Sequence, residues 1–323
     1  MCLARRCVSI ALFLVVLVCF ARGTCRASSI APSPEVTAIV DKIYSFDLDA
    51  AAREAQHFQS EHPDDPLGYL LEGEALWWNI WCTSADFKWG MTDARHRPKL
   101  ASDQHYFDLA GNAYSLAVAK IRRRDSAEMQ FYAGMADALA ARLYGLRGEN
   151  RATARTGVRA RQSFLRAIEL DPDFADADFG LGLYNYYVDT LSSFAKMLRF
   201  FMGIPGGSKQ EGLRQLERAI SSGVLTPTIA RIYLALNLHR YDQQYARALK
   251  FLAPVAEKYP GNPLFQLMLG DLHAKLGHKD KALLYYSAAA ALPVADADCR
   301  KRTQALAHAA AAAVAGVDAT RKP

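Results

Sequence analysis

Cysteine is scarce in this 323-residue chain, which contains 6 in all. Cys2, Cys7 and Cys19 crowd near the N-terminus, and only Cys82 and Cys299 lie far from it. So few cysteines do not make the disulfide framework that small secreted domains depend on. We therefore expect stability to come from a packed core, which a 51% apolar composition can supply.

The sequence also lacks the short motifs of common active sites. It contains no His-Glu-x-x-His zinc motif, no Gly-x-Ser-x-Gly elbow and no Gly-x-Gly-x-x-Gly turn. Cys82, Asp93, His96 and His105 could in principle surround zinc, but their spacing matches no compact zinc pattern. We therefore expect a non-enzymatic protein with no metal and no cofactor.

No long hydrophobic run suited to a membrane span occurs near the N-terminus. Arg5 and Arg6 precede an apolar run over 8–20, and the small residue Ala27 follows. Thirteen residues are too few to cross a bilayer of roughly 30 Å, so the pattern indicates a secretory signal peptide over 1–27. We expect Sec-type export in a bacterium, to the periplasm or the envelope.

Little positive charge remains after the signal peptide. Its removal takes away four arginines and no acidic residue, so the net charge falls from +6 to +2, with 35 basic and 33 acidic residues left. Nucleic-acid-binding proteins show a concentrated basic surplus. The charge balance therefore excludes nucleic acid as the expected partner.

What the sequence does contain is a repeated helical pattern. Near the C-terminus, Leu269-Gly270 lies in one expected helix, and Gly277 ends it because glycine tolerates the left-handed conformation. In the next helix, small and aromatic residues recur at i, i+4 and i+7 on one face. Six copies of this second-helix pattern share one register: Ala51, Ala55, Phe58; Ala110, Tyr114, Ala117; Ala160, Phe164, Ala167; Gly212, Leu216, Ala219; Ala248, Leu252, Val255; Ala282, Tyr286, Ala289.

This lattice resembles the tetratricopeptide repeat family, whose unit has Leu-Gly in the first helix, Ala-x3-aromatic-x2-Ala in the second and a closing Pro. The resemblance covers about residues 34–294. The chain is similar to secreted bacterial tetratricopeptide proteins that have insertions in their N-terminal repeats. It implies an all-α, right-handed α-solenoid of about six helical hairpins within 28–323. An alanine-rich helix near 296–316 would cap the array.

Only the last two units keep the plain period, and extra residues separate the helices of three others. We place insertions at about 79–104, 143–156 and 188–208. The last one includes Ser193 and Lys196, but no companion motif of an acyl-transfer site accompanies them. Its Gly-rich turn also fails the phosphate-loop spacing, since Ser208 stands where the second glycine belongs.

Within that insertion, the spacing predicts a helix over about 191–201. Phe194, Leu198 and Phe201 would share an apolar face at i, i+4 and i+7. We expect this helix to pack on the solenoid. Contact of 194–204 with a ligand or a membrane surface is the alternative.

All four tryptophans lie in the first insertion or just before it. Trp77 and Trp81 fall on one helix face with Trp78 beside them, and Trp89 follows. Two interpretations stay open: the indoles seal a thickened N-terminal core, or they form the aromatic wall of a binding groove.

Members of the tetratricopeptide family usually bind a peptide or a partner helix on the concave face, which the first helix of each unit lines. The resemblance therefore implies a largely aromatic wall with few hydrogen-bonding groups, which either binds an apolar or aromatic ligand or is buried by the insertions. Its residues would be Trp77, Trp78, Phe131, Met135, Phe179, Leu183, Tyr186, Tyr187, Tyr233, Asn237, Arg240 and Tyr241, followed by Leu267, Asp271 and Lys275.

Together these features predict a non-enzymatic exported protein that binds a protein or peptide partner as a scaffold in an envelope assembly. The alternative is a binder of lipid or another apolar small ligand in the aromatic concave groove.

Overall fold

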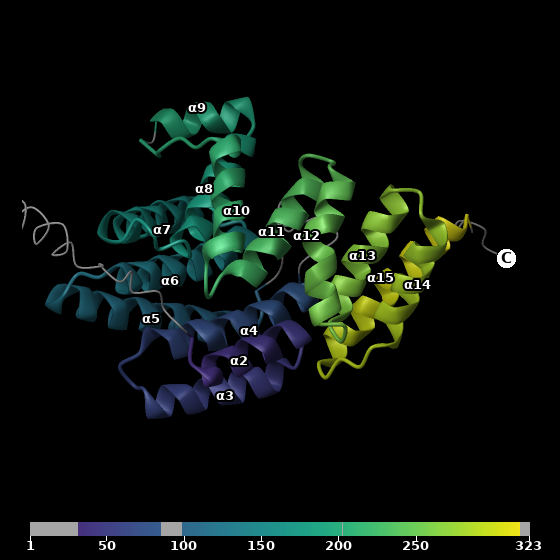
Figure 1. Ribbon diagram of the computed structural model, residues 1–323, viewed down its shortest axis with the longest axis horizontal. Coiled ribbons are helices and arrows are strands. Elements are labelled where there is room, and N and C mark those ends of the chain that lie inside the picture. Colours follow the sequence, from purple (N-terminus) through teal and green to yellow (C-terminus); the bar gives the residue numbers. More distant parts are fainter. Residues whose placement is uncertain (1–31, 85–98, 202, 317–323) are drawn as a thin grey trace, which may run out of the picture.

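The chain folds entirely into helices and their connections over the residues that the computed structural model describes, which are 32–84, 99–201 and 203–316 (Figure 1). This confirms the all-α prediction. The helices are α2 (Pro34–Ser45), α3 (Leu48–Glu61), α4 (Pro66–Ser84), α5 (Asp103–Arg123), α6 (Ala127–Leu146), α7 (Asn150–Leu170), α8 (Ala177–Thr190), α9 (Ser193–Phe201), α10 (Lys209–Ser222), α11 (Pro227–Arg240), α12 (Tyr245–Lys258), α13 (Pro263–Lys275), α14 (Lys279–Ala291) and α15 (Ala297–Ala315). The expected signal peptide lies outside the described residues.

Consecutive helices pack against each other along the chain, and α10 packs on α8 across the short α9. The second helix of each pair buries the face that the lattice predicts. In α14, for example, Ala282, Tyr286 and Ala289 are the buried residues. The faces of α3, α10 and α12 are buried in the same way. Small residues let the helices approach, and one large residue fills the space between them.

Glycine permits the closest of these approaches. A Cβ placed on Gly270 would lie 2.5 Å from Tyr286 Cε1, so the ring occupies the space that a side chain would need. A Cβ on Gly182 would lie 2.9 Å from the Gly212 carbonyl oxygen. Gly277, which follows α13, has φ +79°, as expected for a glycine that ends a helix.

The three expected insertions differ in structure. Residues 143–156 do not form a separate loop, because they lengthen α6 and α7 on either side of a three-residue connection. In the first insertion, α4 continues to Ser84, and 85–98 lie outside the described residues. The third contains α9, close to the helix expected at 191–201.

Figure 1 shows α9 on the far side of α8 and α10 from α2 and α3. Lys196 Nζ pairs with Asp189 at 3.0 Å, and Arg199 donates to the Ile204 carbonyl at 3.2 Å. Phe200 is 77% exposed. The side chains of Phe194, Leu198 and Phe201, on which the packing prediction depends, lie outside the described part of the structure.

The first helices meet the last third of the chain, so the array closes on itself. Asp41 in α2 accepts hydrogen bonds from Lys258 Nζ at 2.9 Å and from Tyr259 Oη at 2.6 Å. Asn262 Nδ2 donates to the Tyr44 carbonyl at 2.9 Å over a sequence separation of 218 residues. Figure 1 shows the ends of α2 and α4 beside α13.

A disulfide joins Cys82 at the end of α4 to Cys299 at the start of α15, with a Cα–Cα distance of 5.3 Å. One disulfide thus adds to the packed core from which stability was expected to come. The two cysteines have a sequence separation of 217 residues, and nothing in their spacing indicates that they meet.

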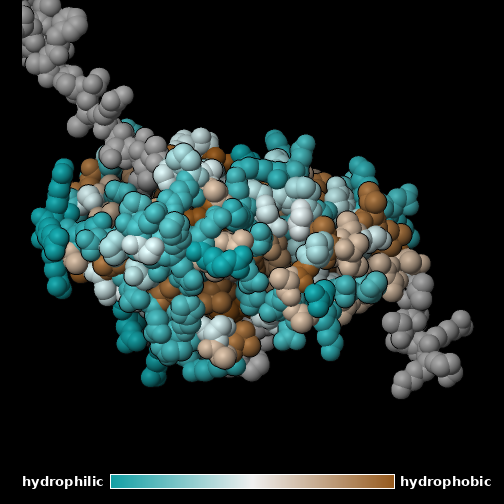
Figure 2. Space-filling model, turned by 90° about the horizontal axis from the view of Figure 1, so that it is seen from below, coloured by the Kyte–Doolittle hydropathy of each residue, from teal (hydrophilic) through white to brown (hydrophobic). Residues whose placement is uncertain are grey.

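Figure 2 shows the face of the molecule on which α2 and α3 lie. Hydrophilic side chains predominate there, and hydrophobic ones are more frequent toward the C-terminal end. Among the described helices, none is both long enough and apolar enough to serve as a membrane span.

Candidate functional site

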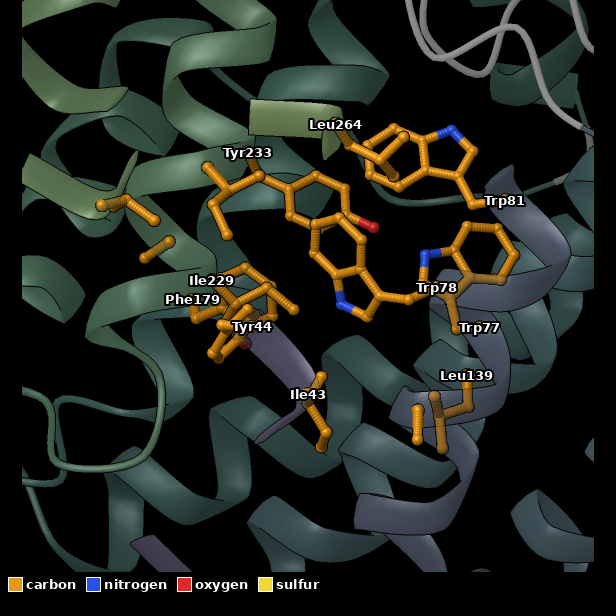
Figure 3. Close-up of a cluster of buried hydrophobic side chains, with 14 of the residues drawn as sticks. Ile43, Tyr44, Trp77, Trp78, Trp81, Leu139, Phe179, Ile229, Tyr233 and Leu264 are labelled. Carbon is orange, nitrogen blue, oxygen red and sulfur yellow. The ribbon is translucent and has the colours of Figure 1, made fainter. Parts of the chain in front are cut away.

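The tryptophans of α4 lie in the interior of the molecule. Trp77 and Trp78 are each 1% exposed, and their indole rings contact residues from distant helices. The Trp78 ring lies 6.0 Å from Tyr44 of α2 and 5.7 Å from Phe265 of α13, both edge-on. Figure 3 shows the indoles projecting from α4 toward Tyr233 and Leu264. Of the two interpretations left open, this burial favours a core seal over a groove wall.

An ion pair whose side chains are each 13% exposed lies beside this aromatic cluster. Arg142 of α6 pairs with Glu74 of α4 at 2.5 Å, and its guanidinium lies 4.8 Å from the centre of the Trp77 ring. A third contact joins Arg142 to the Tyr233 hydroxyl at 3.4 Å. The pair thus connects α4, α6 and α11 through one guanidinium, a geometry that fixes how these helices pack.

The protonation states in this cluster follow from burial. Burial raises the pKa of the Tyr233 and Tyr106 hydroxyls above the ordinary tyrosine value, so both remain neutral; Tyr106 donates to the Leu139 carbonyl and Tyr233 accepts from Arg142. Burial alone would lower the pKa of Arg142, but Glu74, Tyr106 and Tyr233 together outweigh it and hold that pKa well above the ordinary value. The guanidinium of this cluster therefore stays charged.

The predicted concave residues divide into two groups. Seven are buried: Trp77, Trp78, Phe131, Phe179, Tyr186, Tyr233 and Asn237. Phe179 lies 5.9 Å from Tyr233 ring to ring, and Tyr186 Oη donates to the Asn237 carbonyl at 3.1 Å. Five remain half-buried: Met135, Leu183, Tyr187, Arg240 and Tyr241.

Four of the half-buried residues lie on α8 and α11 or just beyond it, and we call Leu183, Tyr187, Arg240 and Tyr241 the tyrosine rim. The Tyr187 and Tyr241 rings are 6.2 Å apart in an edge-on arrangement. The Arg240 guanidinium lies 5.3 Å from the centre of the Tyr241 ring. Tyrosine and arginine are the residue types that dominate binding energy at protein interfaces. The rim therefore offers aromatic faces and a cation at a partly solvated edge.

Beside the rim, α11, α12 and α13 enclose a small crevice of about 20 Å³. Its walls are mostly apolar and consist of Ala235, Leu236, His239, Leu252, Met268, Asp271 and Leu272. A space of this size holds about one water molecule. It is too small for the acyl chain of a lipid.

Only two of the four zinc candidates, Cys82 and His105, lie among the described residues. Cys82 is in the disulfide, His105 lies 3.0 Å from Glu72, and Asp93 and His96 lie outside the described residues. In the described part of the chain, the ligand atoms of Glu35, Glu61 and His62 do lie within 4.8 Å of one another. Glu61 and His62 are exposed, and such surface clusters are common without an ion.

Sequence reasoning missed the buried charged residues that join distant segments. Arg147 forms a bidentate pair with Asp103, through Nε at 2.7 Å and Nη2 at 2.5 Å. The Asp176 carboxylate accepts hydrogen bonds from the backbone N–H groups of Val224, Leu225 and Thr226. The one signal available in the sequence was a charged residue at an otherwise apolar helix position. This signal does not indicate which residue the charge pairs with.

A comparison of the chain with models of known protein families finds no match, and a comparison with curated proteins finds none either.

Proposed function

We propose that this chain is a non-enzymatic helical-repeat protein of the tetratricopeptide type, which binds a protein or peptide partner as a scaffold. The observation that carries the proposal is the tyrosine rim. In the rim, aromatic and cationic groups of the expected concave wall stay half-exposed, whereas seven other residues of that wall are buried.

The repeat architecture is part of this proposal. The helix pairs and their buried small-large-small faces support a right-handed array of about six hairpins, capped by α15. The glycine approaches between α8 and α10 and between α13 and α14 add support, since they fall where the repeat pattern expects them.

Export to the periplasm or envelope is also proposed. The Cys82–Cys299 disulfide supports it, because disulfides persist in oxidising compartments and are rare in the cytosol. Binding of a lipid in the concave groove has less support, because the aromatic side chains there pack on one another and the neighbouring crevice is small.

Site-specific photo-crosslinking tests the binding proposal. A benzoyl-phenylalanine would replace Tyr187 or Tyr241 of the rim, and the matched control would replace Leu284, which is 66% exposed on α14. We expect one protein to crosslink at both rim positions and not at the control. Equal capture at all three positions, or at none, would contradict the proposal.

Native mass spectrometry of the purified protein distinguishes the scaffold from the alternative, a lipid-binding protein. An apo mass fits the scaffold, whereas a co-purified lipid would favour the lipid-binding function.

A further inference from the structure

The helix α15 is held to α4 by a covalent bond between two fully buried cysteines. Beside the sulfurs, Arg302 donates to the Thr83 carbonyl at 3.5 Å. This end of the molecule therefore differs from the contact between α2 and the α12–α13 connection, which involves an ion pair and several hydrogen bonds without a covalent bond.

The fully buried side chains of α15 are small. They are Cys299, Thr303, Ala307 and Ala310, while Leu306 and Val314 are partly buried against the core. Small side chains remove little apolar surface from water, and burial of apolar surface is the main stabilising contribution of a packed helix. The disulfide is the covalent restraint that adds to this packing and keeps α15 against α4.

A hydroxyl group lies beside both sulfurs. Thr303 is 1% exposed, and its Oγ1 is 3.6 Å from Cys82 Sγ and 3.9 Å from Cys299 Sγ. A hydroxyl can donate to a thiolate. In thiol–disulfide exchange, a cysteine leaves faster when its thiolate is better stabilised. The site thus contains a group suited to assist cleavage of this bond.

We propose that the Cys82–Cys299 disulfide is a redox-controlled latch, and that its reduction releases α15 from the end of α4. The reductant is a dithiol. One of its thiolates attacks a sulfur and forms a mixed disulfide, and the other cysteine leaves as a thiolate that Thr303 stabilises. The second thiolate of the reductant then displaces the remaining cysteine. Two electrons pass to this chain, two protons are taken up by Cys82 and Cys299, and the reductant becomes a disulfide.

Release of α15 uncovers the C-terminal end of α4, where Trp81 is 3% exposed in the closed form. Because the α2 contacts do not depend on the disulfide, opening is confined to this end of the array. The opening itself does not rest on the proposed function.

Hydrogen exchange read by mass spectrometry tests the latch without any partner. Three states are compared: the oxidised protein, the protein reduced with dithiothreitol, and the Cys82→Ser/Cys299→Ser variant. We expect exchange in peptides of α15 to rise at least tenfold in the last two states, with a smaller rise at the end of α4. Peptides of α7, far along the chain from both cysteines, are the internal control, and their exchange should rise less than that of α15, by no more than the fall in global stability allows.

Unchanged exchange in α15, or an equal rise in all peptides including α7, would overturn the latch. Either result leaves the crosslinking test of the tyrosine rim unaffected. The role of Thr303 is tested by the rate of reduction, measured as the mass gained on alkylation of the freed thiols. Thr303→Val should slow reduction severalfold and Thr303→Ser should not, and equal rates in the two variants would contradict this role.

Discussion

A single carboxylate can join turns that are far apart in the chain, and Asp176 is the clearest case in this molecule. It is 3% exposed and accepts three backbone N–H groups at the start of α11, together with the Thr226 hydroxyl at 2.7 Å. These N–H groups precede a helix, where negative charge is also favoured by the helix dipole. The connection before α8 and the connection before α11 are thereby held together.

Replacement of Asp176 by alanine should lower the free energy of unfolding by about 3 kcal/mol or more, because buried N–H groups would lose their acceptor. The measurement is the urea midpoint at neutral pH. Asp173→Ala, an exposed change in the same connection, is the control and should have a small effect. A similar midpoint for the two variants would show that water replaces the carboxylate.

A histidine pair makes stability depend on pH. His273 Nδ1 lies 3.1 Å from His278 Nδ1, so one ring donates and the other must be neutral to accept. Burial, with Lys281 and His278 nearby, lowers the pKa of His273 below its ordinary value. As pH falls through about 6.5, the unfolded chain therefore takes up a proton that the folded chain resists. Stability should decline as pH falls from neutral toward 5.

The test compares unfolding free energies at several pH values in the parent protein and in His273→Gln, whose dependence should be flatter. Asp178 has the opposite effect on the pH dependence of stability from that of His273. Burial, partly offset by Arg218, raises its pKa to about 6. The folded state thus gains a proton first as pH falls below 6. Asp178→Asn should therefore make the acid decline steeper, and identical profiles for all three proteins would contradict both assignments.

At the scale of helices, the approach of α8 to α10 depends on two glycines that face each other. A Cβ on Gly182 would lie 2.8 Å from Leu216 Cγ and 3.0 Å from the Leu216 backbone nitrogen. Backbone atoms cannot move aside as a flexible side chain can. The two helices that flank α9 are therefore kept close by the absence of a side chain.

Gly182→Ala should overpack this contact and cost about 1–3 kcal/mol. The matched control is Gly111→Ala in α5, where a Cβ would meet nothing within 4 Å. That change should stabilise the protein by about 0.5–1 kcal/mol, because alanine is the better helix former. Thermal unfolding of both variants is the measurement. A shift of the same sign in both would show that the α8–α10 contact tolerates a methyl group.

At the scale of the whole molecule, the buried face of a helix can be predicted from the sequence, whereas contacts between distant residues cannot. The small-large-small faces, such as Ala160, Phe164 and Ala167, repeat over a few turns, so periodicity alone predicts which side of each second helix is buried. The Glu74–Arg142 pair spans 68 residues and the disulfide spans 217, and no periodic signal links such positions. The family pattern predicted a concave wall from single units, but whether that wall stays open depends on how the units close on one another.

The disulfide should contribute strongly to global stability because it closes a very long loop. Restricting the unfolded chain over 217 residues corresponds to about 5 kcal/mol in the loop-entropy description. Urea unfolding of the oxidised protein and of Cys82→Ser/Cys299→Ser measures the difference. Midpoints that coincide would mean that the unfolded chain is already compact between these positions.

The closure also sets an order of events during biosynthesis. Because a chain is synthesised from its N-terminus, α4 emerges long before α13 and α15, and Trp78 has no cover from Phe265 of α13 in the interval. Contacts across 217 residues form slowly, because the ends must meet before any energy is gained. The nascent chain is therefore most prone to aggregate before its last helices emerge. The supply of a chaperone that shields aromatic surface should then set the yield of folded protein.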